Sequence, residues 1–166
     1  MPIHGLVQQS VFTASFTASL TTTDPRDLCS ILASSLSRVQ VYEVIAGIVS
    51  TGITDAQNVG ITLLRGSTAL AVGSAIPVAN HAGWSAAPAA GSSCTGNSTT
   101  LGSTTSAVQI HADVTQAGRY AYKPLPDYAP ILEKSQRLHV RMTAPSAQPI
   151  TVHGSITFAE IGQKPF

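Results

Sequence analysis

The stretch Ile150-Thr-Val-His-Gly-Ser-Ile-Thr-Phe-Ala-Glu160 decides the fold. Successive side chains of a β-strand point to opposite faces, so an alternation of apolar and polar residues predicts a strand with one face in the core. The stretch alternates in this way, with one set expected inside and the other in water: Ile150, Val152, Ile156 and Phe158 against Thr151, His153, Ser155 and Thr157.

The segment just upstream predicts a second strand. Leu138, Val140 and Met142 alternate with polar residues there. Between the two strands, 143–149 contains two prolines, which cannot donate to a sheet ladder and suit a turn. We therefore expect the end of the chain to form an antiparallel pair.

The same pattern recurs along the rest of the chain. Val11–Leu20 alternates, with its two phenylalanines on the inward side, and shorter alternating runs are spread over the remainder. Uneven spacers and the absence of a convincing helix favour long crossovers. We expect an all-β fold, a jelly-roll or Greek-key antiparallel β-sandwich of about eight strands. The further strands are expected at 38–50, 58–65, 75–78, 108–113, 119–123 and 131–132.

One domain, 1–166, accounts for the length. An N-terminal arm, 1–9, precedes the first strand, and a long flexible loop, 83–106, is expected because it holds little besides Ala, Gly, Ser, Thr and Pro. The run after Pro25 containing Leu28 and Ile31 fits either a helical turn or a short strand, and the residues do not decide between them.

Val39–Val49 is apolar on both parities. Val39, Val41, Ile45 and Val49 fall on one, whereas Tyr42, Val44 and Ile48 fall on the other. A strand with two apolar faces is either central in a sandwich or covered by a neighbouring subunit.

Composition argues against several partners. Charged residues make up 10% of the 166, and the formal net charge is +1 with no basic run, so we expect no nucleic acid. No stretch approaches the about 18 to 20 apolar residues of a membrane helix. Residues 1–10 lack the pattern of a signal peptide, so synthesis in a cytosol is expected.

Cys29 and Cys94 are expected to be free, buried thiols.

Candidate chemistry is sparse. His111, His139 and His153 lie on the polar parity of predicted strands, and those at 139 and 153 approach each other if their strands pair. A metal needs three converging ligands, whereas solvent-facing histidines explain the pattern with less coincidence. No nucleophile elbow, phosphate loop or calcium loop is present. We assign no catalytic, cofactor-binding or metal-binding residue and expect no enzyme.

Aromatic residues near loops suggest another reading. Four of them are candidates for a carbohydrate platform, since sandwich domains bind sugars at loop ends: Trp84, Tyr120, Tyr122 and Tyr128. Tyr120 and Tyr122 share a parity and are better explained as half-buried core or interface residues.

The course from Arg38 to Glu160 resembles small virion proteins of tailed bacteriophages. The resemblance rests on low charge and on these segments: Arg38-Val-Gln-Val-Tyr-Glu-Val-Ile-Ala-Gly, Asp55-Ala-Gln-Asn-Val-Gly-Ile-Thr-Leu-Leu-Arg65, a small-residue middle, Gln136-Arg-Leu-His-Val-Arg-Met and Ile150–Glu160. It covers about two-thirds of the chain and includes no diagnostic motif.

The resemblance implies a capsid decoration or cement protein with a jelly-roll fold, located on the capsid surface of the virion and made in the host cytoplasm. Its partners would be the major capsid protein and further copies of itself, as a trimer or dimer. Candidate contact regions are 39–49, 1–9, 83–106 and 162–166, with these interface residues: Tyr42, Val44, Ile48, Trp84, Tyr128 and Phe166. A tail or fibre accessory module that binds glycans and a cupin-like metal enzyme are the alternatives.

Overall fold

A computed structural model describes residues 10–20, 24–49, 58–66, 73–81, 90–96, 108–116, 119–143 and 150–161. This part of the chain is all-β apart from one 3₁₀ turn, η1 (Pro126–Tyr128). The strands are β1 (Val11–Leu20), β2 (Arg26–Leu32), β3 (Arg38–Ile48), β4 (Asn58–Gly66), β5 (Ser74–Ile76), β6 (Val78–Asn80), β7 (Ser93–Gly96), β8 (Val108–Gln116), β9 (Arg119–Tyr122), β10 (Ile131–Leu132), β11 (Arg137–Thr143) and β12 (Ile150–Ile161).

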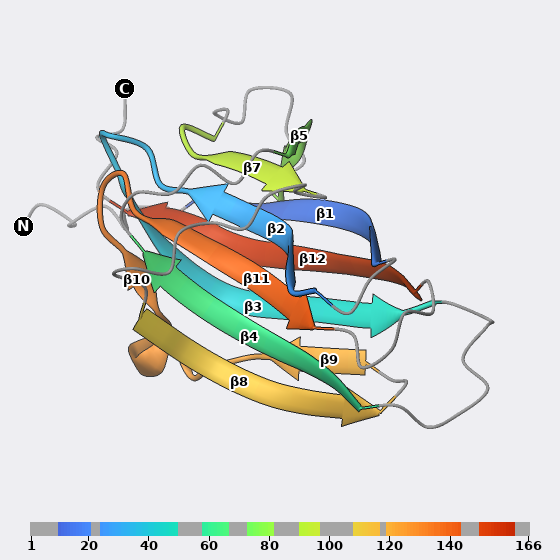
Figure 1. The fold of residues 1–166 in the computed structure, drawn as a ribbon. Coiled ribbons are helices and arrows are strands. Elements are labelled where there is room, and N and C mark those ends of the chain that lie inside the picture. The colour runs from blue at the N-terminus through green and yellow to red at the C-terminus, as the bar shows by residue number, and fades with distance from the viewer. Residues whose placement is uncertain are drawn as a thin grey trace, which may run out of the picture.

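Two antiparallel sheets pack face to face (Figure 1). Sheet A has the order β10-β3-β12-β1-β6, and β9 also pairs with β3. Sheet B has the order β5-β7-β2-β11-β4-β8. The predicted antiparallel β-sandwich is confirmed.

The connectivity is that of a jelly roll. Leaving aside four short strands, β5, β6, β7 and β10, eight strands remain. The first pairs with the eighth (β1 with β12), the second with the seventh (β2 with β11), the third with the sixth (β3 with β9) and the fourth with the fifth (β4 with β8). An antiparallel ribbon folded over itself gives this nested set of pairs.

The inward side chains of β1 and β12 form the centre of the core. Phe12 and Phe158 face each other across the two strands, with ring centroids 5.6 Å apart, and both are buried. Ile150, Val152 and Ile156 are also buried, so the predicted inward parity is confirmed.

Gly154 makes room for a phenylalanine within this pairing. It lies opposite Phe16, and a Cβ at residue 154 would clash with the ring of Phe16 and with the carbonyl oxygen of Ile45. A glycine is required here because the ring occupies the space of the missing side chain.

The expected pairing of the last two strands is wrong. β12 pairs with β1 and β3 in sheet A, whereas β11 pairs with β2 and β4 in sheet B. Alternation identifies a strand and its inward side, but it carries no information about which strand lies beside it.

A β-bulge explains why Val39–Val49 looked apolar on both faces. Opposite β12, Phe158 pairs with Val41 and Thr157 pairs with Glu43, so Tyr42 is the extra residue. A bulge shifts the parity by one position. As a result, Val39, Val41 and Val44 are all buried on the core side of one strand.

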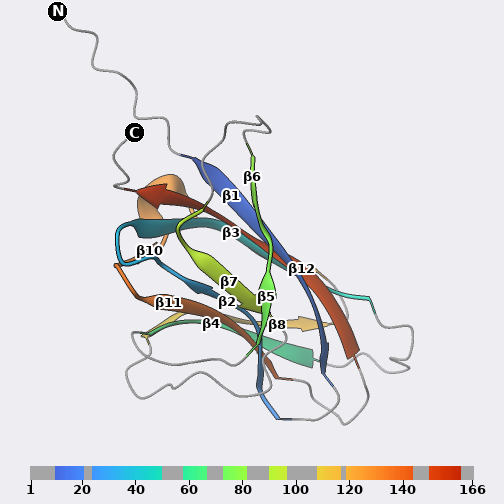
Figure 2. The ribbon, with the colours of Figure 1, turned by 90° about the horizontal axis from the view of Figure 1, so that it is seen from above.

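The remaining predictions have mixed outcomes. The undecided run after Pro25 is a strand, β2, and the predicted strand at 75–78 is two short strands separated by Pro77. Figure 2 shows them along one side of the sandwich, with β6 paired to β1 and β5 paired to β7. β7 lies inside the stretch 83–106, so the prediction of a long loop is wrong for Ser93–Gly96. Residues 83–89, 97–106 and the arm 1–9 lie outside the described residues.

Candidate functional site

The predicted interface residues are dispersed. Val44 is fully buried in the core and presents no side chain to the surface. Tyr42 and Ile48 are half-buried, and Ile48 packs against the core. Tyr128 is 78% exposed. Trp84 and Phe166 lie outside the described residues.

The most exposed of these, Tyr128, belongs to an apolar surface at the edge of sheet A, which we call the β10-edge surface: Leu125, Tyr128 and Ile131. Their side chains are 69%, 78% and 38% exposed. Leu125 is the extended residue directly before η1, Tyr128 is the last residue of η1, and Ile131 begins β10 three residues later. Large apolar side chains gathered on a surface are a common mark of a protein contact.

Hydrogen bonds and three prolines hold the β10-edge surface in place. The backbone amide of Tyr128 donates to the carbonyl of Leu125 (2.9 Å), and the amide of Val41 donates to the carbonyl of Pro130 (3.0 Å). The side-chain amide of Gln40 donates to the carbonyl of Pro126 (3.0 Å). A segment fixed before binding loses little conformational entropy when a partner docks.

The three candidate histidines do not form one site. His139 is buried on the outer side of β11, in sheet B, whereas His153 is exposed on the outer side of β12, in sheet A. The two rings were predicted to approach each other only if their strands paired, and β11 and β12 do not pair. The side chain of His111 lies outside the described residues. Within the described ranges, no three His, Cys, Asp or Glu side chains gather closely enough to hold a metal ion.

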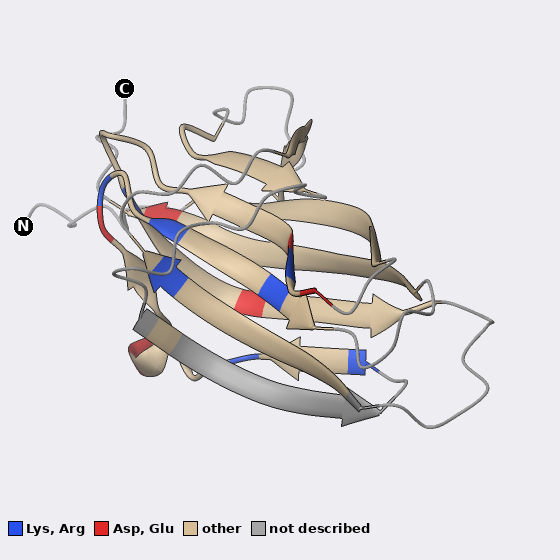
Figure 3. Ribbon diagram, in the orientation of Figure 1, with Lys and Arg blue, Asp and Glu red and all other residues tan. Residues whose placement is uncertain are grey.

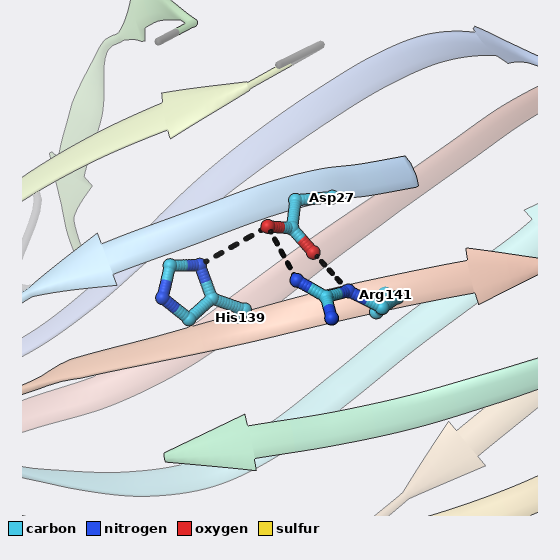
Figure 4. A network of polar contacts seen from close by, with 3 residues as sticks. All are labelled: Asp27, His139 and Arg141. Carbon is cyan, nitrogen blue, oxygen red and sulfur yellow. Dashed lines mark hydrogen bonds and ion pairs between the residues drawn. The ribbon is translucent and has the colours of Figure 1, made fainter. Parts of the chain in front are cut away.

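A buried polar network lies where His139 was expected to face water (Figure 4). Arg141 donates two hydrogen bonds to the Asp27 carboxylate, from Nε to Oδ1 (2.8 Å) and from Nη2 to Oδ2 (3.1 Å). Nδ1 of His139 lies 3.5 Å from Oδ2 of Asp27. The side chains of Asp27 and His139 are 0% and 2% exposed, so the network is shielded from solvent.

A second β-bulge brings these residues to one face. Opposite β11, Val140 pairs with Cys29 and Arg141 pairs with Asp27, so Leu28 is the extra residue of β2. Leu28 and Cys29 both enter the core, while Asp27 turns to the outer side of the sheet. Without the bulge, Asp27 would not lie opposite Arg141.

The environment disfavours the charged form of His139. Burial lowers its pKa from the usual 6.5; the Asp27 carboxylate raises it, and the guanidinium groups of Arg141 and Arg137 lower it further. His139 is therefore neutral near pH 7. The negative charge of Asp27 is balanced by the guanidinium of Arg141, which donates both of its hydrogen bonds to that carboxylate.

The sequence did not predict this network, because alternation assigned three residues of β11 to the solvent-exposed side of the strand: Arg137, His139 and Arg141. Asp27 was assigned no role, since nothing local marks its bulge. The one available signal was an alternating strand carrying two arginines and a histidine in a chain with 10% charged residues.

The two cysteines behave as predicted. Cys29 and Cys94 are free and buried in the core. Burial raises the pKa of the Cys94 thiol to about 12, and burial together with the nearby Cys94 raises the pKa of Cys29. Thiols with raised pKa values are poor nucleophiles at neutral pH.

No protein-family model matches the chain, and no curated protein matches it with significance. None of the described segments forms a helix with the length and hydrophobicity that a membrane crossing requires.

Proposed function

We propose that this chain is a structural virion protein of a bacteriophage, which decorates or cements the capsid shell as a homo-oligomer bound to the major capsid protein. The resemblance of residues 38–160 to small virion proteins supports the proposal. The jelly-roll connectivity agrees with it, although lectin domains and cupins share that fold. Fold alone does not choose a function.

The observation that carries the proposal is the β10-edge surface. It presents an exposed leucine and an exposed tyrosine on a proline-framed segment. Tyrosine is enriched among the residues that dominate binding energy at protein interfaces, and a preformed apolar contact suits a permanent assembly. A protein that joins shell subunits needs such a surface and no catalytic cleft.

The test uses particles of the phage that encodes the chain. Purified particles are expected to contain many copies by quantitative mass spectrometry, and cryo-electron microscopy is expected to place the jelly roll on the shell. A chain absent from the particles, or a purified chain that is monomeric and never binds a shell, would refute the proposal.

Two matched variants locate the contact. Tyr128→Asp is expected to fold, because the side chain is 78% exposed, yet to lose most binding to shells that lack the chain. Ser15→Asp, on the exposed outer face of sheet A, is expected to bind normally. Loss of binding only with Ser15→Asp would move the contact to that face.

The glycan-binding alternative shares one observation, the exposed Tyr128. A glycan array on the purified chain separates the two readings, because a cement protein is expected to give no signal there. The cupin-like alternative loses support, since His139 and His153 lie on opposite outer faces.

A further inference from the structure

Three buried polar atoms form a row across the outer face of sheet B without a hydrogen-bond partner. They are Oγ1 of Thr95 on β7, Oγ of Ser30 on β2 and Nδ1 of His139 on β11. Nδ1 of His139 lies 3.5 Å from Oδ2 of Asp27 but makes no hydrogen bond of acceptable geometry to it. Ser30 lies directly opposite Thr95 on one side and His139 on the other. Residues directly opposite in an antiparallel sheet share a face, so the three side chains are neighbours.

Leaving such atoms unpaired is costly. A buried polar group without a partner destabilises the folded state, and folded proteins leave few of them. Cβ atoms of directly opposite residues are about 4.5 to 5.5 Å apart. One small molecule that makes hydrogen bonds of about 2.8 Å to each side chain spans such a gap.

The three groups specify the chemistry of that molecule. Both hydroxyls donate and accept, and a neutral imidazole nitrogen does one or the other according to its tautomer. The adjacent carboxylate of Asp27 is already matched by Arg141, so the row offers no net charge to an ion. A small neutral molecule that both donates and accepts fits, and water is that molecule.

We propose that the row Thr95–Ser30–His139 binds ordered water, which bridges β7 to β2 and β11. The bound water supplies the hydrogen bonds that the three side chains lack. It also adds a side-chain link between the jelly roll and β7, which pairs with β2 over only four residues. The inference is independent of the proposed function.

The sign of one stability change tests the site. If water is bound, Ser30→Ala removes one of its ligands and raises the equilibrium constant for unfolding about tenfold, the effect of losing one buried hydrogen bond. If the hydroxyl has no partner, the same substitution removes a destabilising group, and the constant stays the same or falls. That second outcome would overturn the proposal.

Ser15→Ala is the matched control. The side chain of Ser15 is exposed on the outer face of sheet A, so bulk water can pair its hydroxyl without a buried site. The proposal requires Ser30→Ala to be clearly more destabilising than Ser15→Ala in urea unfolding. Equal effects of the two substitutions would contradict it.

A high-resolution crystal structure of the unmodified chain decides the matter even if the variant does not fold. Water density is expected within hydrogen-bond distance of at least two of the three atoms. A map without such density would refute the site.

Discussion

The outer faces of the two sheets look alike in sequence and differ in the folded protein. On sheet A, the outer side chains of β1 and β12 face each other in pairs, and all of them carry small hydroxyl groups except His153: Thr13 with Thr157, Ser15 with Ser155, Thr17 with His153 and Ser19 with Thr151. Four of these side chains are exposed to solvent: Ser15, Thr17, Ser19 and His153. On sheet B, Asp27, Ser30 and His139 occupy the equivalent side and are almost completely buried.

Charge differs between two of the strands compared. β1 of sheet A carries no charged residue, whereas β11 of sheet B carries Arg137 and Arg141. Figure 3 shows blue positions on β11 and none on β1. β3, which is also in sheet A, carries Arg38 and Glu43. Charged groups are costly to bury, so those of sheet B require matched partners, while the hydroxyls of sheet A need only water. The difference teaches that alternation assigns side chains to a face without revealing whether that face is wet.

The largest expected effect compares the two sides of sheet A itself. Phe158 is fully buried, so Phe158→Asp would bury an unpaired charge and is expected to prevent folding, as circular dichroism would show. Thr157→Asp, one residue earlier on the outer side, is expected to cost about 1 kcal/mol or less. Near-normal folding of the Phe158 variant would contradict the assignment of sides.

The next effect compares the two outer faces directly. Arg141→Met leaves Asp27 buried without its bidentate partner and is expected to cost about 3 to 5 kcal/mol in urea unfolding. His153→Ala, on the exposed face of sheet A, is expected to stay within about 0.5 kcal/mol. Similar costs for the two substitutions would mean that the faces do not differ.

A double variant sharpens this second comparison. When both members of a buried ion pair are replaced by apolar residues, no uncompensated charge remains. Asp27→Leu combined with Arg141→Met is therefore expected to recover much of the stability lost in Arg141→Met. A further loss in the double variant would show that the network contributes more than matched charges.

The smallest effect is a pH dependence. The pKa of His139 is lower in the folded chain than the 6.5 of an unfolded histidine, because of burial and two arginines, despite Asp27. The unfolded state then binds more protons below about pH 6.5, so stability is present above that pH and decreases as the pH falls towards the folded pKa.

Urea unfolding at pH 7 and pH 5 measures this dependence. The decrease in stability on acidification is expected to shrink in His139→Gln and to persist in His153→Gln. An unchanged pH dependence in the His139 variant would refute the assignment.

Local patterns predicted much of the fold and little of the candidate site. Alternation located the inward phenylalanines of β1 and β12, because every second side chain of a strand shares a face. The Asp27 network was hidden, because it depends on an extra residue at Leu28 and on burial of an outer face. The β10-edge surface was anticipated only at Tyr128.

By itself the sequence determined an all-β chain, the inward parity of its long strands and two thiols for the core, since these follow from a two-residue period and from residue size. Only the tertiary structure decided that β11 and β12 belong to different sheets, that bulges at Leu28 and Tyr42 change the parity, and that Asp27 and His139 are buried. Strand partners and covered faces depend on contacts between residues far apart in the chain, which a local period does not record.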